Sequence, residues 1–225
     1  MGATELNRTD TAQTARATGL RGVVLDYGEV VARRPASAKL ERMAAAVGLD
    51  TPTFADRYDQ ERRPYDRGDL SPRDYWSKVV PGTIELHAEL LGKLRQWDVE
   101  MWSDTNAVMI EWLAQLRAAG FKTALLSNMH CDMVVRVRRE LEWFEQLDFA
   151  VLSSEVRLAK PERAIYERCL AGLALEPSEV LFIDDREVNV QGAIGAGWKA
   201  LCFRSLEWLH HDLTRMSFPV LPALQ

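Results

Sequence analysis

The amino-acid sequence predicts an α/β fold: a Rossmann-like parallel sheet with helices on both faces and a helical cap inserted after the first strand. Three observations support this fold class. Short apolar segments alternate with segments of helical spacing, as in parallel sheets that are covered on both faces. Residues 33–102 interrupt this alternation with a long stretch rich in charged and aromatic side chains. Polar residues follow several of the apolar segments, at the strand ends where such sheets bind ligands.

The elements of the sheet are predicted in order along the chain. Residues 22–26 form the first strand. Apolar side chains between residues 106 and 119 recur at helical spacing, and Gly120 ends this helix. Helices are also predicted from Pro161, because proline suits the first turn of a helix, and at residues 190–196. The remaining strands are predicted at residues 122–127, 149–153, 180–183 and 198–203.

The stretch after the first strand predicts a domain of its own. Proline and glycine residues divide it into four helices, at residues 37–47, 52–62, 71–79 and 85–94. An insertion of this size at this place is expected to form a lid over the sheet edge, and the alternative is a decorative extension. The predicted domains are a disordered leader (1–20), an α/β core (21–32 and 103–225) and a helical cap (33–102).

Composition excludes several classes of protein. The chain has 225 residues, of which 47% are hydrophobic and 27% charged, and this is typical of a soluble globular protein. Its net charge of −5, without a long basic run, gives no electrostatic footprint for nucleic acid. No apolar stretch reaches membrane-spanning length, and residues 1–20 lack the apolar region of a secretory signal. Three scattered cysteines predict free thiols and a cytoplasmic location: Cys131, Cys169 and Cys202.

Two adjacent carboxylates, Asp184 and Asp185, directly follow the apolar run 180–183. Acids at the end of a buried strand are unfavourable unless a cation holds them, although a solvated pair at a loop is the plainer alternative. The first strand delivers a third carboxylate, Asp26, in the same way. Mg²⁺ in proteins takes one or two carboxylates together with substrate phosphate. The pattern therefore predicts a magnesium site at this edge of the sheet.

Four segments together resemble the haloacid dehalogenase superfamily, most of whose members are Mg²⁺-dependent phosphohydrolases. They are residues 24–30, 125–128, 158–161, and 182–185 with Asn189, and the resemblance covers about residues 21–204. The Asp-x-Gly-x-Val pattern at residues 26–30 is similar to the branch of sugar-1-phosphate phosphatases and of the phosphatase domains of epoxide hydrolases. Residues 65–71, followed by Tyr75 and Trp76, resemble the helical cap of that branch.

The resemblance implies a nucleophile and a metal site. Asp26 would attack phosphorus and form an aspartyl-phosphate, which divides one difficult displacement into two easier steps. Mg²⁺ would be held by Asp26, by the backbone carbonyl of Gly28 and by Asp185, and would neutralise charge between nucleophile and phosphate.

The resemblance also implies the groups around this centre. Ser127 and Asn128, between a strand and a helix, would bind phosphate oxygens. Lys160 would supply a positive charge for the phosphate and for the aspartyl-phosphate. Asp184 would orient a metal-bound water or Lys160, and Asn189 would hold a water molecule near the metal.

In the cap, Tyr65, Arg67 and Trp76 are expected to line the substrate pocket, with packing inside the cap as the alternative for Trp76. His130 is expected at the surface or in a helix cap, without a catalytic role.

One departure from the family pattern concerns the proton donor. Many family phosphatases carry a second aspartate two residues after the nucleophile, where this chain has Gly28. Glu29 lies one residue out of register and is expected to point away from the site. Turnover then requires an acid from the cap, a metal-ordered water, or a leaving group that needs no acid, such as the anomeric oxygen of a sugar 1-phosphate.

The leading hypothesis is a Mg²⁺-dependent phosphatase acting on a small phosphorylated metabolite, a sugar 1-phosphate among the candidates. The first alternative is a 2-haloacid dehalogenase that forms an ester at Asp26. It is disfavoured because dehalogenases of this family lack tandem acids such as Asp184 and Asp185. The second alternative is a phosphate-binding regulatory protein without turnover. A phosphomutase is disfavoured because it needs the acid that is missing at Gly28. The sequence does not predict the oligomeric state.

Overall fold

The sheet has five parallel strands in the order β3-β2-β1-β4-β5. Its central strand is β1, in which Leu25 lies in register with Leu125 on one side and with Ile183 on the other. Because all strands run in one direction, their carboxyl ends meet at one edge. The strands are β1 (Gly22–Leu25), β2 (Lys122–Ser127), β3 (Phe149–Leu152), β4 (Val180–Asp184) and β5 (Lys199–Cys202).

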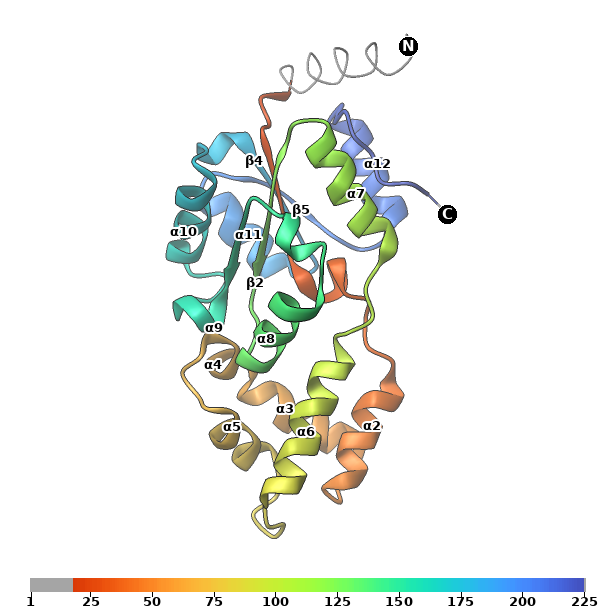
Figure 1. Ribbon diagram of the computed structural model, residues 1–225, viewed down its shortest axis with the longest axis vertical. Helices are drawn as coiled ribbons and strands as arrows, with labels where there is room; N and C mark the ends of the chain where they lie inside the picture. Colours follow the sequence, from red (N-terminus) through yellow and green to blue (C-terminus); the bar gives the residue numbers. More distant parts are fainter. Residues whose placement is uncertain (1–17, 225) are drawn as a thin grey trace.

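The structure is a computed structural model that describes residues 18–224 (Figure 1). Most of the predicted leader, residues 1–17, lies outside the described residues. Leu20, which the predicted boundary left outside the core, is buried in it.

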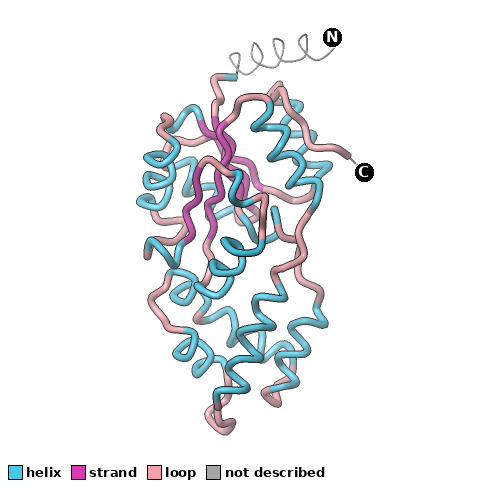
Figure 2. Tube along the Cα trace, viewed as in Figure 1, coloured by secondary structure: helices cyan, strands magenta, loops and turns pink. Residues whose placement is uncertain are grey.

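Helices pack on both faces of the sheet, as predicted (Figure 2). Successive strand residues point to opposite faces, so that Val23 and Leu25 belong to one core cluster and Val24 to the other. The first cluster receives α7 (Ala107–Ala118), α8 (Cys131–Glu140) and α12 (Leu206–Arg215). The second receives α10 (Arg163–Leu173) and α11 (Glu187–Gly195).

The cap consists of five helices beyond the carboxyl edge of the sheet (Figure 1). It has a hydrophobic core of its own, to which Phe54, Tyr75, Trp76 and Leu94 contribute fully buried side chains. Ser71 and Asp74 form a reciprocal capping box at the start of its fourth helix. The helices are α2 (Ser37–Ala46), α3 (Thr51–Gln60), α4 (Arg62–Arg67), α5 (Pro72–Val79) and α6 (Ala88–Met101).

Two chain segments, paired antiparallel with each other, connect the cap to the core. After β1 the chain makes a single wide π-helical turn, η1 (Tyr27–Val31), and then pairs Ala32 with Thr105. The N–H of Arg33 donates to the carbonyl of Asp104 at 2.7 Å. The segments that enter and leave the cap therefore lie side by side, a few residues after Asp26 at the carboxyl edge of the sheet.

Several element boundaries differ from the prediction. The predicted helix at residues 52–62 corresponds to α3, which ends at Gln60 because Glu61 leaves helical geometry at φ −106° and ψ 8°. Pro161 precedes α10 instead of opening it, and a cis peptide bond joins it to Lys160. Four helices were not predicted: α4, α8, α9 (Ser153–Val156) and α12. The predicted helix at residues 85–94 corresponds to α6, which extends to Met101. Short 3₁₀ turns lie at Phe144–Gln146 and Pro177–Glu179.

The three cysteines are free thiols, as predicted. Among the helices of residues 18–224, none combines the length and the apolarity that crossing a membrane requires.

Candidate active site

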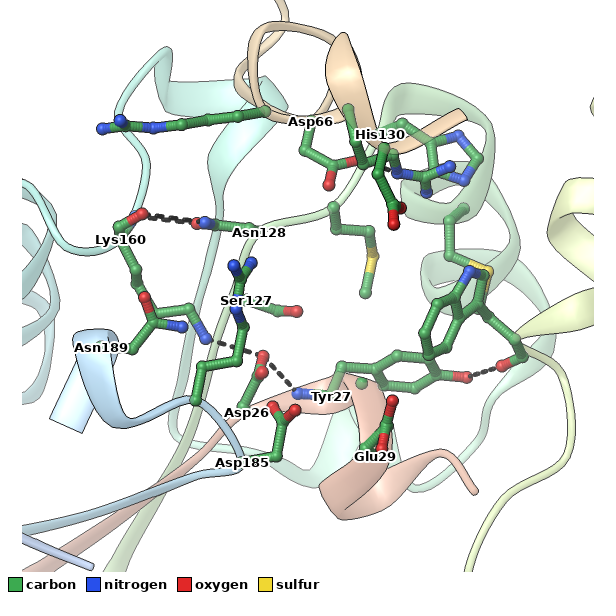
Figure 3. Close-up of a pocket in the computed structure, with 18 of the residues that line it drawn as sticks. Asp26, Tyr27, Glu29, Asp66, Ser127, Asn128, His130, Lys160, Asp185 and Asn189 are labelled. Carbon is green, nitrogen blue, oxygen red and sulfur yellow. Dashed lines mark hydrogen bonds and ion pairs between the residues drawn. The ribbon is translucent and has the colours of Figure 1, made fainter. Parts of the chain in front are cut away.

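A cavity of about 670 Å³ lies between the carboxyl edge of the sheet and the cap (Figure 3). Most of the predicted site residues line it from the core: Asp26, Gly28, Ser127, Asn128, Lys160, Asp185 and Asn189. Asp184, fully buried, lies behind this wall. The cap contributes a second wall: Tyr58, Asp59, Arg62, Arg63 and Asp66.

Asp26 is fixed at the end of β1 by its backbone and by its side chain. Its N–H donates to the carbonyl of Ile183 at 2.9 Å, which continues the ladder with β4. Its Oδ1 accepts from the N–H of Tyr27 at 2.7 Å and lies 2.8 Å from Nζ of Lys160. Burial raises the pKa of Asp26 to about 6, although the positive charge of Lys160 opposes this shift.

Lys160 connects the acids of two neighbouring strands. Its Nζ lies 2.8 Å from Asp26 and 2.6 Å from Oδ2 of Asp184. Burial works against protonation of Lys160, but Asp26 and Asp184 outweigh it and raise the pKa of this ammonium group. The side chain of Asn128 forms two hydrogen bonds with the backbone of Lys160. Asn128 Oδ1 accepts from the Lys160 N–H at 2.8 Å, and Asn128 Nδ2 donates to the Lys160 carbonyl at 3.0 Å. The side chain of Asn128 thus positions the lysine.

Asp184 is a fully buried acid whose partners are all in place. Besides Lys160, it accepts from Nδ2 of Asn189 at 2.9 and 3.1 Å and from the N–H of Arg186 at 2.8 Å. These contacts agree with the expectation that Asp184 orients Lys160. Asn189 directs its amide nitrogen to Asp184 and so helps to hold this carboxylate in place.

The residues at the end of β1 and β4 could hold a divalent cation. Carboxylate oxygens of Asp26, Asp184 and Asp185 all lie within 4.8 Å of one another. Burial and then the charges of Asp26, Asp184 and Glu29 raise the pKa of Asp185 to about 7. Three acids therefore oppose the ionisation of Asp185, and only Lys160 favours it. A hard cation bound here would supply the missing positive charge.

Glu29 differs from its prediction. It lines the same cavity and adds to the negative charge at Asp185. The register argument failed because Glu29 adopts a left-handed conformation, with φ 54°, inside the π-helical turn, and this conformation redirects its side chain. Its carboxylate also pairs with Arg34 at 2.7 Å.

The predicted cap residues do not line the cavity. Tyr65 stacks between Tyr75 at 4.2 Å and His130 at 5.0 Å between ring centroids. Trp76 is fully buried in the cap core, which agrees with the alternative expectation that it packs inside the cap. Arg67 forms ion pairs with Asp69 and Glu162. For Tyr65 and Arg67 the reason lies in the phase of α4. Residues four apart share one helix face, and in α4 that face belongs to Arg62 and Asp66.

Arg62 and Asp66 are the site residues that sequence reasoning missed. Nε of Arg62 lies 3.0 Å from Oδ1 of Asp66, and Nη1 lies 3.0 Å from both carboxylate oxygens of Asp98. Tyr58 donates to Asp98 at 2.5 Å and also contacts Arg62. The signal in the sequence was an Arg and an Asp at positions i and i+4, which predicts an ion pair on one face of a helix.

His130 is buried, contrary to the expectation of a surface position. It stands at the N-cap of α8, but its side chain makes no capping hydrogen bond. The ring stacks on Tyr65, and Nε2 lies 3.5 Å from Asp98. Burial lowers the pKa of His130 to about 4, although Asp98 opposes this shift.

A family model described as a haloacid dehalogenase-like hydrolase matches residues 9–197 of the chain. The chain is 27% identical over 135 residues to (S)-2-haloacid dehalogenase 1 of Pseudomonas sp., a match that covers 57% of this chain and 59% of that protein. It is 28% identical over 124 residues to bifunctional epoxide hydrolase 2 of Rattus norvegicus, covering 52% of this chain and 22% of that protein. The chain therefore spans less than two thirds of either relative.

A solved structure of a HAD family enzyme from Bacteroides thetaiotaomicron, in complex with magnesium and inorganic phosphate, has the same fold. The TM-score is 0.64 at 18% identity, and the match covers 82% of this chain and 94% of that chain. Because the family model matches most of the sequence and its fold is the one observed, this chain belongs to the haloacid dehalogenase-like hydrolases.

Proposed function

We propose that the chain is a Mg²⁺-dependent phosphatase that hydrolyses a small phosphorylated metabolite through an aspartyl-phosphate at Asp26. The observation that carries this proposal is the arrangement at the sheet edge, where Lys160 contacts Asp26 at 2.8 Å and Asp185 faces an excess of negative charge. Asp26, Asp185 and the backbone of Gly28 would hold the ion. When bound, Mg²⁺ supplies positive charge that allows an anionic carboxylate to approach an anionic phosphate.

Residues of the chain would carry out the attack on phosphorus, the stabilisation of the transferring phosphoryl group and the binding of phosphate. The Asp26 carboxylate attacks phosphorus, and its orientation is fixed by the Tyr27 N–H and by Lys160. Lys160 stays protonated next to two acids, so it can stabilise negative charge on the transferring phosphoryl group. Ser127 and the backbone of Asn128, at the end of β2, would bind phosphate oxygens.

The cavity supports a small substrate. Its volume of about 670 Å³ is that of a site for one metabolite, and it lies between cap and core. The cap wall presents Arg62, Arg63, Asp59 and Asp66, which suit a polar leaving group such as a sugar. We therefore keep sugar 1-phosphates among the candidate substrates. The three free cysteines suit a reducing cytoplasm as the place of action.

A 2-haloacid dehalogenase is the second candidate, because one curated relative carries that name. In that reaction Asp26 would displace halide and form an ester with carbon. Asp185 argues against it: Lys160 already pairs with Asp26 and Asp184, and a metal-free reaction leaves the repulsion between Asp185 and the neighbouring acids uncompensated.

A phosphoester panel decides among these functions. The purified protein is assayed for phosphate release from aryl, sugar and acyl phosphates with Mg²⁺ and with excess chelator, and for halide release from 2-chloropropionate. The proposal expects phosphate release that chelator abolishes. Halide release alone would establish the dehalogenase, and phosphate binding without release of any product would establish a regulatory protein.

A further inference from the structure

Asp66 stands where the cap faces the nucleophile. It is the acid near the end of α4 and lines the cavity on the side across from Asp26 (Figure 3). Only 13% of its side-chain surface is exposed, and its Oδ1 lies 3.0 Å from Nε of Arg62. Arg62 is in turn held by Asp98, so the partner that orients Asp66 is itself fixed.

Contacts between cap and core determine where Asp66 lies relative to Asp26. The hydroxyl of Ser153, at the start of α9, donates to the backbone carbonyl of Asp66. Two residues later Gly68 packs against Ser154 so closely that an added Cβ would lie 2.9 Å from the Ser154 carbonyl oxygen. These contacts dock the end of α4 on the core, next to the strands that carry the nucleophile.

Other groups that line the cavity are less suitable proton donors than Asp66. Glu29 pairs with Arg34 and lies beside Asp185, on the metal side. Asp59 is exposed to solvent. His130 has a pKa of about 4 because it is buried, so it carries no extra proton near neutral pH. Gly28 has no side chain to offer.

The electrostatic surroundings of Asp66 favour its protonated form. Burial raises the pKa of Asp66 to about 6; Arg62 opposes this shift, and the charges of Asp98 and Asp26 add to it. A general acid works best when its pKa lies near the operating pH, because it is then both protonated in part and able to give up its proton. The Asp66 carboxyl meets this condition in the resting protein.

We propose that Asp66 is the general acid and base of this hydrolase and replaces from the cap the aspartate that Gly28 lacks. This role rests on the proposed phosphatase function. As the Asp26 oxygen bonds to phosphorus, the bond to the leaving oxygen breaks and its electron pair stays on that oxygen, which takes the Asp66 proton. The resulting carboxylate then takes a proton from water. The water oxygen attacks phosphorus, and inorganic phosphate and the Asp26 carboxylate are released.

The dependence of rate on leaving group tests this role. With Asp66 as acid, kcat/KM of the wild type should vary little between aryl phosphates and primary alkyl phosphates under saturating Mg²⁺. Asp66→Asn should lower kcat/KM for alkyl phosphates by about 10²–10⁴-fold and for nitrophenyl phosphate by less than ~10-fold, since a good leaving group needs no proton. Asp69→Asn, an exposed acid three residues away, is the matched control and should change neither value.

Three outcomes would overturn the assignment. An equal loss for all substrates in Asp66→Asn would show a structural role, and no loss would show that the acid is elsewhere. If Asp66→Asn does not fold, the wild-type series decides alone, because a steep loss of rate with leaving-group basicity means that no acid operates. A wild type that hydrolyses no phosphoester at all would instead remove the proposed phosphatase function.

A rescue variant provides an independent test of the role of Asp66. An added Cβ at Gly28 meets only a ring atom of Trp102 at 3.5 Å, and φ of −64° suits any residue, so Gly28→Asp is sterically acceptable. In the Asp66→Asn background, Gly28→Asp should restore part of the rate on alkyl phosphates while changing the aryl rate little. Failure to restore any alkyl rate, with Mg²⁺ dependence intact, would count against Asp66 as the missing acid.

Discussion

At the scale of single residues, the charges of Lys160, Asp26 and Asp184 are tolerated in the interior because they are paired with one another. Lys160 is 2% exposed, and its ammonium group lies between Asp26 and Asp184. Asp184 in turn receives three further hydrogen-bond contacts, from Asn189 and Arg186. Removing one member of such a network leaves an unpaired buried charge, which is why these positions constrain one another.

His130 leads to a prediction about pH and stability. Its pKa of about 4 in the folded protein is below the value of 6.5 for a free histidine, so the unfolded chain binds a proton between these values while the folded protein does not. This contribution to the free energy of unfolding is complete above pH 6.5 and is lost as the pH falls toward 4. Asp66, with its raised pKa, contributes with the opposite sign between 3.8 and about 6.

The comparison of wild type with His130→Gln isolates the histidine, because Asp66 is present in both. Urea unfolding at pH 7 and pH 5 should show that His130→Gln loses less stability on acidification than the wild type does. Equal losses in the two proteins would mean that His130 titrates normally and is not buried as described.

At the scale of elements, the phase of α4 decides which of its residues line the cavity. The sequence predicted a helical cap, and helices are present there, but the predicted contacts Tyr65 and Trp76 face the cap core. Amphipathic spacing cannot separate a face that packs from a face that lines a cavity when both carry aromatic and charged residues. The division between α3 and α4 at Glu61 sets that phase. Its mark in the sequence is Pro64, which has no N–H to donate to the carbonyl of Gln60, but a proline alone does not predict the phase of the helix that follows.

Gly68 tests whether the docking of α4 matters. It has a left-handed φ of 83° and packs against Ser154, whereas Gly48 has a similar φ of 63° with nothing within 4 Å of an added Cβ. Gly48→Ala should therefore cost only the backbone strain, about 1–2 kcal/mol. Gly68→Ala should cost about 1–3 kcal/mol more, because backbone atoms must move.

The activity of the two glycine variants provides the second readout. Gly68→Ala should lower the rate on alkyl phosphates, since it displaces Asp66, and Gly48→Ala should leave it unchanged. Equal effects of the two substitutions on stability and on rate would show that the contact with Ser154 does not position α4.

At the scale of the whole molecule, the sequence predicted the sheet and the convergence of its strand ends. Alternating elements imply a parallel sheet, and a parallel sheet brings Asp26, Ser127 and Asp184 to one edge whatever the details of packing. The cap wall was beyond prediction because it depends on how two separately folded layers dock. Contacts such as Arg95 with Asp132, at 2.8 and 2.5 Å between α6 and α8, join residues far apart in the sequence.

Binding of Mg²⁺ should be visible in the stability of the whole protein. A ligand present at 100 times its Kd raises the free energy of unfolding by about 2.7 kcal/mol, and here it would also relieve the repulsion among the acids around Asp185. Thermal unfolding should therefore shift to higher temperature with Mg²⁺ in the wild type and much less in Asp185→Asn. An equal shift in both proteins would place the ion elsewhere.

The central claim is that Asp26 is a metal-assisted nucleophile toward phosphorus. The most direct measurement is the rate of nitrophenyl phosphate hydrolysis by wild type and by folded Asp26→Asn, each with Mg²⁺ and with excess chelator. We predict Mg²⁺-dependent turnover by the wild type and none above background by Asp26→Asn. Turnover by Asp26→Asn at the wild-type rate, or wild-type turnover that persists undiminished in chelator, would contradict the account.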